Sequence, residues 1–271
     1  MKRLAPVCIL LLAALAGAQE KDAAAAPEPG TVKVIQDMEF VWVPAGAFTP
    51  GLEGGGVAVK DALGGREEWF NDEAPRPEVT FERGFWMSRT EVTRTQWRRI
   101  MNSEPWLDTG AGGGQEVPAT GVTWQDAATF AKTLGKNAEG VFRLPTENEW
   151  EYACRAGTAG LFPFEGTDAN VLAAHAWFRG NTPDGLIQDV GQKTPNAWGL
   201  LDMLGNAWEW CADERVSAGK GGGEPARALR GGAANQTALL TRPTARAALP
   251  ADQRGPRVGF RIVCAPADAA E

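Results

Sequence analysis

The chain has 271 residues, of which 44% are hydrophobic, and its formal net charge is -7. A chain of this length without internal repeats is expected to form one large domain. Nucleic acids and anionic membranes are bound through surfaces rich in lysine and arginine, so the acidic balance argues against both as partners.

The N-terminus has the pattern of a secretion signal. Lys2 and Arg3 precede an apolar run from Leu4 to Ala16, and the small residues that end at Ala18 suit signal peptidase. The run is shorter than the about 20 residues that span a bilayer. We therefore expect a signal peptide at residues 1–18, a flexible linker at 19–30, a folded domain at 31–266 and a tail at 267–271. The mature protein is expected to be secreted or periplasmic and to make no membrane contact.

Short elements follow one another along the domain. Brief strands are expected at residues 40–43 and 79–81, and the glycine-rich segment 51–65 between them is typical of a mobile surface loop. Capping-box patterns begin two helices, at Thr93 and at Thr146, and Thr123 opens an apolar helical face that stops at Gly135. With 33 glycines and 18 prolines, this pattern predicts an α+β fold with little regular secondary structure.

Six longer motifs are spread over most of the domain. They are FVWVPAGAF at 40–48, DEAPRPEVTFERGFWMSRTEVTRTQW at 72–97, FRLPTENEWEYACRAGT at 142–158, PNAWGLLDMLGNAWEWCAD at 195–213, ALRGG at 228–232 and RVGFRIV at 257–263. In this order they resemble the formylglycine-generating-enzyme family, also called the sulfatase-modifying-factor domain. The resemblance implies a single irregular α+β domain, similar to the C-type lectin fold.

The chain departs from this family at two positions. In the oxidase members, two cysteines follow the paired glycines, bind copper and oxidise a substrate cysteine. Counted from Gly231 and Gly232, these positions hold Gln236 and Thr241. An amide and a hydroxyl cannot replace the soft thiolates that select Cu(I). We therefore expect no catalytic residue at these degenerate positions and no bound copper.

The resemblance also implies a calcium site. Its ligands would be the side chains of Asp202 and Glu209 and the backbone oxygens of Gly205 and Ala207, all hard oxygen donors of the kind that Ca²⁺ prefers. The alternative is structural: Asp202 caps a turn and Glu209 pairs with an arginine such as Arg143 or Arg261. One calcium ion per chain is the expectation.

Without the signal peptide the chain keeps Cys154, Cys211 and Cys264. The resemblance implies a disulfide between Cys154 and Cys264, which leaves Cys211 free. The alternative is that all three are buried and reduced.

Arginines gather near the former oxidase loop, where the resemblance puts a substrate groove. We expect Arg242, Arg246 and Trp208 to line this groove, which would suit an acidic peptide or an acidic sugar; solvated surface arginines are the alternative. Trp69, Trp106 and Trp177 are further candidates for stacking against a ligand.

Two classes of function follow from these residues. The first is a binding or accessory domain without oxidase activity, for a peptide, protein or glycan partner. The alternative is an oxidoreductase of the same family that acts by a changed mechanism, so whether the chain is an enzyme stays open. The oligomeric state is not indicated by the sequence.

Overall fold

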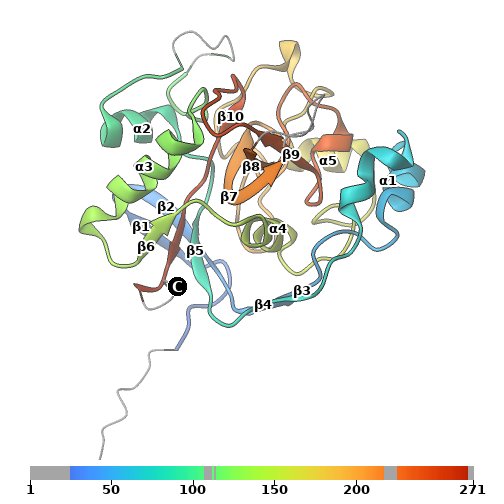
Figure 1. Ribbon diagram of the computed structural model, residues 1–271, viewed down its shortest axis with the longest axis horizontal. Coiled ribbons are helices and arrows are strands. Elements are labelled where there is room, and N and C mark those ends of the chain that lie inside the picture. Colours follow the sequence, from blue (N-terminus) through green and yellow to red (C-terminus); the bar gives the residue numbers. More distant parts are fainter. Residues whose placement is uncertain (1–24, 107–111, 113, 217–224, 268–271) are drawn as a thin grey trace, which may run out of the picture.

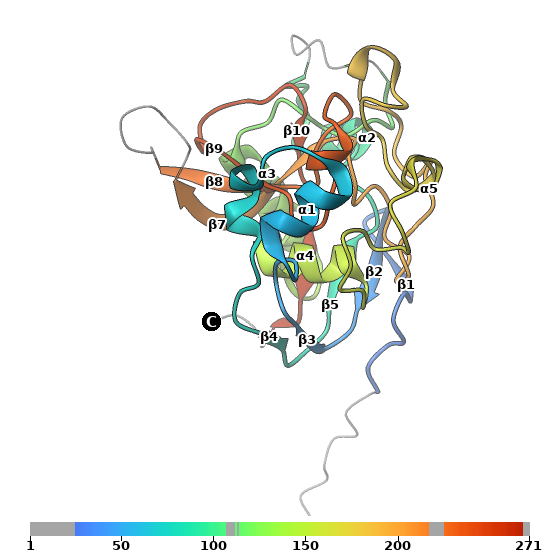
Figure 2. The ribbon, with the colours of Figure 1, turned by 90° about the vertical axis from the view of Figure 1, so that its right-hand side faces the viewer.

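The computed structural model describes residues 25–106, 112, 114–216 and 225–267 (Figures 1 and 2). The expected signal peptide, residues 19–24 of the expected linker and residues 268–271 of the tail lie outside this part of the chain. Within the described residues, no helix combines the length and the apolar character needed to cross a membrane. The backbone N–H of Gly30 donates to the carbonyl of Trp42, so the end of the expected linker is already bonded to the domain.

The fold is α+β, as predicted, and consists of short strands and helices. The strands are Val32–Ile35 (β1), Met38–Val43 (β2), Gly46–Phe48 (β3), Val79–Phe81 (β4), Phe85–Ser88 (β5), Val141–Arg143 (β6), Trp208–Val216 (β7), Pro225–Arg230 (β8), Arg246–Leu249 (β9), Val258–Gly259 (β10) and Val263–Ala265 (β11). The α-helices are Gly55–Leu63 (α1), Arg94–Met101 (α2), Trp124–Leu134 (α3), Glu147–Arg155 (α4) and Ala169–His175 (α5). Short 3-10 helices are Glu67–Glu73 (η1), Gly135–Asn137 (η2), Pro183–Gly185 (η3) and Ala238–Leu240 (η4).

A five-stranded antiparallel sheet in the order β1-β2-β5-β11-β6 separates two hydrophobic clusters. Side chains alternate between its faces. Phe40 and Phe142 belong to the cluster that contains α3, whereas Val41 and Met87 belong to the cluster that contains α4. Figure 1 shows α2 and α3 together near β1, β2 and β6, with α4 on the other side of β5. The two clusters thus form the core on either side of one sheet.

The three predicted helix starts are confirmed by reciprocal caps. Thr93, Thr123 and Thr146 each accept a hydrogen bond from the backbone N–H three residues later, and the side chain of that later residue accepts from the backbone of the threonine. Such a box satisfies two of the N–H groups that a helix leaves without an internal partner. These helices begin where local sequence alone indicates.

The segment 51–65 was expected to be a loop, and this prediction is wrong. It contains α1, which buries Val59 against Leu52 and Phe70. The glycines make this helix hard to predict from the sequence, because glycine lowers helix propensity. Gly56 is nevertheless needed for packing: a Cβ at this position would come within 2.6 Å of the Glu67 carbonyl oxygen in η1. Tertiary packing therefore overrides the local preference of the segment.

A second sheet, in the order β10-β7-β8-β9, carries the motifs nearest to the former oxidase loop. The short β10 pairs only with Trp208 and Glu209 of β7, while β8 pairs with β7 up to Val216 across a register shift. In Figure 2 the far ends of β7 and β8 point away from the rest of the domain. The near ends of these strands are fully buried and supply the charged residues described next.

Candidate functional site

The loop between β8 and β9 contains the two degenerate positions. Thr241 is fully buried, and its hydroxyl donates to the carbonyl of Ala238 at 3.3 Å. Gln236 is half-buried, and its backbone carbonyl accepts from the N–H of Arg179 at 2.8 Å. The loop closes tightly, because a Cβ on Gly232 would lie 2.2 Å from the carbonyl oxygen of Leu240. At the two positions expected from the resemblance, the loop therefore presents a half-buried amide side chain and a buried hydroxyl.

The predicted groove of Arg242, Arg246 and Trp208 is wrong. Arg242 has no exposed surface, and its guanidinium forms a two-point ion pair with Glu73 at 2.5 and 2.8 Å. Arg246 binds both carboxylate oxygens of Glu147 at 3.0 and 2.9 Å, and Trp208 is only 8% exposed. A buried guanidinium needs a carboxylate partner, since an unpaired buried charge is very costly. These side chains hold the loop to the domain and do not line a basic groove.

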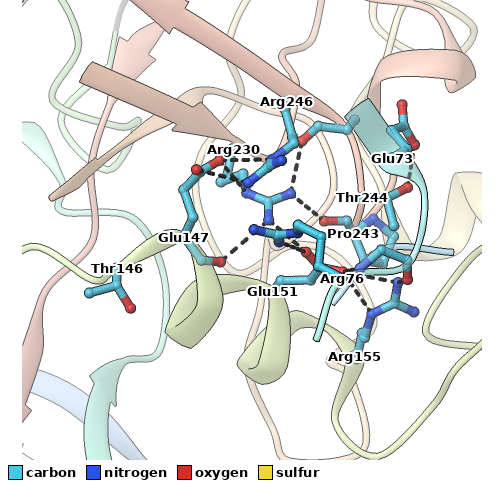
Figure 3. Close-up of polar contacts among 12 residues, drawn as sticks. Glu73, Arg76, Thr146, Glu147, Glu151, Arg155, Arg230, Pro243, Thr244 and Arg246 are labelled. Atoms are coloured by element: carbon cyan, nitrogen blue, oxygen red, sulfur yellow. Dashed lines mark hydrogen bonds and ion pairs between the residues drawn. The ribbon is translucent and has the colours of Figure 1, made fainter. Parts of the chain in front are cut away.

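The same loop is tied to α4 by a larger buried ion-pair network, shown in Figure 3. Arg230, fully buried, bonds to Glu151 at 2.6 Å, and Arg155 bonds to the other oxygen of Glu151 at 3.1 Å. Burial alone would raise the pKa of Glu151, but Arg230, Arg155 and the N–H of Gly51 together hold it below its ordinary value. Glu151 is therefore ionised and joins α4, β8 and the segment before α1.

Glu209 and Arg261 form a second buried pair in the expected calcium region. Both side chains are fully buried, and the guanidinium of Arg261 donates to the two carboxylate oxygens at 2.6 and 2.8 Å. The indole N–H of Trp150 donates to the same carboxylate at 2.7 Å. Of the two interpretations of Glu209, the structure therefore contains the ion pair with Arg261.

Asp202 keeps one oxygen for a further partner. Its Oδ2 accepts from the N–H of Gly191 at 2.6 Å, but its buried Oδ1 has no hydrogen-bond partner. Burial raises the pKa of Asp202 to about 6. Glu91, a residue that the sequence did not single out, is also fully buried with neither carboxylate oxygen bonded, and burial followed by the charge of Asp202 raises its pKa.

These acids lie together because three segments meet there. The N–H of Leu201 donates to the carbonyl of Arg89, and the N–H of Val92 donates to that of Phe260. No group of three or more histidine, cysteine, aspartate or glutamate side chains with metal-binding geometry occurs among the described residues. What the region offers a cation is unbonded carboxylate oxygen on Asp202 and Glu91.

The predicted disulfide is absent from the structure, which has Cys154, Cys211 and Cys264 as buried free thiols. Cys154 lies in the cluster with α4 and donates to the carbonyl of Met203, whereas Cys264 lies in the other cluster and donates to that of Glu139. Alternation along β11 sends Cys264 to the sheet face opposite Cys154. A disulfide between Cys154 and Cys264 would require β11 to present the opposite set of side chains to each face of the sheet.

The tryptophans expected to stack against a ligand do not form one surface. Trp106 is buried, Trp69 is 59% exposed beside Phe70, and Trp177 is half-buried under the ammonium of Lys193. Trp124 packs against the cluster that contains α3 and lines a groove together with Arg227. That groove carried no signal in the sequence, because its residues come from separate elements.

Similar proteins include formylglycine-generating enzymes and inactive relatives of them. The chain is 35% identical over 133 residues to the formylglycine-generating enzyme of Streptomyces coelicolor, which covers 45% of this chain and 39% of that protein. It is 34% identical over 164 residues to the inactive C-alpha-formylglycine-generating enzyme 2 of Mus musculus, which covers 54% of this chain and 48% of that protein. The chain thus spans less than half of either relative.

Solved structures and the family model extend the comparison over almost the whole chain. PvdO from Pseudomonas aeruginosa is 28% identical with a TM-score of 0.73, over 88% of this chain and 99% of that one. Treponema denticola variable protein 1 shares the fold at 23% identity and a TM-score of 0.70, over 87% of this chain and 99% of that one. Residues 25–266 match the model of the sulfatase-modifying factor enzyme 1-like domain. The chain therefore belongs to this family, as its sequence motifs predicted.

Proposed function

We propose that this chain is an exported binding or accessory domain without copper-oxidase activity, and that its partner is a peptide, protein or glycan. The observation that carries the proposal is the chemistry of the former oxidase loop. Gln236 and Thr241 occupy the two positions at which the oxidases have cysteines. Neither an amide nor a buried hydroxyl can exchange with a substrate thiol or complete a Cu(I) site.

No other thiol takes over this role in the described part of the chain. Cys154 and Cys211 are fully buried, and burial raises the pKa of each thiol above its ordinary value. Only the thiolate is nucleophilic and binds metal. A relative at 34% identity, from Mus musculus, is named an inactive formylglycine-generating enzyme, which supports a family role apart from oxidation.

The test is an oxidation assay. Purified protein with Cu(I), oxygen and a cysteine-containing sulfatase-type peptide should give no aldehyde above a protein-free control, with product followed by mass spectrometry. An active formylglycine-generating enzyme serves as the positive control. Aldehyde formation by the unaltered chain would overturn the proposal and favour the alternative, an oxidoreductase with a changed mechanism.

A bound calcium ion is the second part of the proposal. Three buried carboxyl groups, those of Glu91, Asp202 and Glu209, are accompanied by one fully buried guanidinium, that of Arg261. If all four are ionised, a surplus of negative charge remains in the interior, where uncompensated charge is costly. The unbonded oxygens of Asp202 and Glu91 are hard donors that suit Ca²⁺. The ion would balance this charge and stabilise the junction of the three segments.

A further inference from the structure

We propose that the groove between α3 and the strands β6, β7 and β8 binds an extended acidic peptide segment of a partner protein. The groove has a volume of about 620 Å³, and it is lined by residues that include Trp124, Lys132, Phe142, Arg143, Ala212 and Arg227. This inference rests on the proposed binding function and assigns it a surface away from the former oxidase loop.

The charge of the lining favours an acidic ligand. Its charged side chains are Lys132, Arg143 and Arg227, and no carboxylate lines the groove, although the whole chain carries a net charge of -7. Lys132 is exposed on α3 and makes no ion pair or hydrogen bond with another described residue. A cationic surface on an acidic protein attracts an acidic segment and repels competing basic ones.

The two arginines keep donors for a ligand although each has a partner. Arg143 bonds to both oxygens of Glu149, whose side chain is 8% exposed, and its own side chain is 37% exposed. Arg227 pairs with Glu214, which is 82% exposed, so water screens that pair. Each guanidinium has five N–H donors. Lys132 supplies the free charge and the arginines supply hydrogen bonds.

The aromatic wall of the groove is held in place before any ligand arrives. The indole N–H of Trp124 donates to the carbonyl of Cys211 at 2.8 Å, and the guanidinium of Arg227 lies 4.1 Å from the centre of the Trp124 ring. Arg227 in turn donates to the carbonyl of Ala212 at 2.7 Å. Side chains that are already ordered lose little conformational entropy on binding. The site is therefore preorganised.

The extended form of the ligand follows from β6. Among the described residues β6 pairs only with β11 and is the edge strand of the five-stranded sheet. An edge strand can accept a further strand through its outward backbone groups. In such a peptide, alternate side chains would face the α3 side of the sheet, where Phe142, Leu144 and Lys132 lie, and the others would face the side of Arg143.

The test uses a fluorescently labelled peptide of alternating glutamate and valine, with binding to the whole chain followed by fluorescence anisotropy. We expect saturable binding that weakens as salt is added, because exposed charges are screened. Lys132→Glu should weaken binding by about tenfold or more, since it places like charges opposite one another. Lys136→Glu is the matched control, an exposed lysine in η2 that does not line the groove, and it should leave binding unchanged.

Several outcomes would overturn the inference. They are equal binding of a lysine–valine peptide, equal loss of affinity in the two lysine variants, and undiminished binding of a peptide that is N-methylated at alternate amides. Strong binding of a sulfated oligosaccharide with none of the acidic peptide would assign the groove to a glycan instead. The oxidation assay is independent of these measurements. A result that rejects peptide binding in the groove is therefore distinct from a result that rejects the proposal of a domain without oxidase activity.

Discussion

At Asp202 and Glu91 the fold buries carboxyl groups whose oxygens are not all hydrogen-bonded. Such groups are rare in proteins and call for a further partner, such as an ordered water or an ion. Glu209 differs from them although it lies in the same region, because Arg261 and Trp150 already satisfy its carboxylate. The response of the protein to calcium should therefore depend on Asp202 more than on Glu209.

Calcium should raise the melting temperature of the wild-type protein, and chelator should lower it. A ligand at a hundred times its dissociation constant stabilises the folded state by about 2.7 kcal/mol. Asp202→Ala should abolish the response to calcium, because it removes the unbonded Oδ1. The matched control is Asp189→Ala, at an exposed aspartate, which should respond as the wild type does. Unchanged wild-type melting in chelator would reject the calcium site.

Among the elements, strand alternation and tight contacts decide what local sequence leaves open. Cys264 on β11 pairs across the sheet with Trp86 of β5 and Phe142 of β6. This register sends its thiol toward the cluster of α3 and away from Cys154 on α4. Tertiary contact also decides the segment of α1. It forms a helix because the side chain of Val59 is buried against Phe70 of η1.

The register of β11 and the burial of the three cysteines predict that all three thiols stay free. Peptide mapping without reductant, on protein recovered from an oxidising compartment and alkylated at once after denaturation, should find Cys154, Cys211 and Cys264 each labelled. Burial protects each thiol and raises its pKa, which disfavours oxidation. Recovery of a Cys154–Cys264 linked peptide would contradict the register of this strand.

For the whole molecule, buried ion pairs join segments that are far apart in the chain. Arg242 bonds to Glu73 across 169 residues, and Arg230 bonds to Glu151 across 79. These pairs connect the loop of the former oxidase site to η1 and α4. Figure 3 shows the pair of Arg230 and Glu151. Removing one partner of such a buried pair typically costs about 3–5 kcal/mol, because the other charge is left uncompensated.

Glu151→Gln should lower the free energy of unfolding at neutral pH by an amount in that range, about 3–5 kcal/mol, as measured by urea denaturation. The pKa of Glu151 lies below its ordinary 4.5 in the folded state, so the ionised form stabilises the fold above that pH. This stabilisation is lost as the pH falls through the lowered pKa. The variant should therefore lose less stability than the wild type on acidification below about pH 4.5.

Glu78→Gln, at an exposed glutamate, is the control for this measurement and should behave as the wild type at every pH. Equal acid sensitivity of the wild type and Glu151→Gln would show that the network is not ionised as the structure implies.

The sequence by itself determined the family, the helix starts and which residues stand at the positions where thiols would be expected. Motifs such as PNAWGLLDMLGNAWEWCAD are contiguous, and a capping box such as that of Thr146 involves residues only three positions apart, so short stretches contain the whole signal. The identities of Gln236 and Thr241 likewise need no coordinates, since the chemistry of an amide or a hydroxyl is a property of the residue.

Only the tertiary structure decided the partners of the charged and sulfur-containing groups. Arg242 was expected in a groove and instead pairs with Glu73, and Cys264 faces away from Cys154. Glu91 lies near Asp202, a contact that the motif containing Glu91 at 72–97 does not indicate. The groove of Lys132, Trp124 and Arg227 likewise draws on separate elements. Contacts of this kind depend on how distant segments meet and on what burial then requires of each charge, and neither is contained in a local pattern.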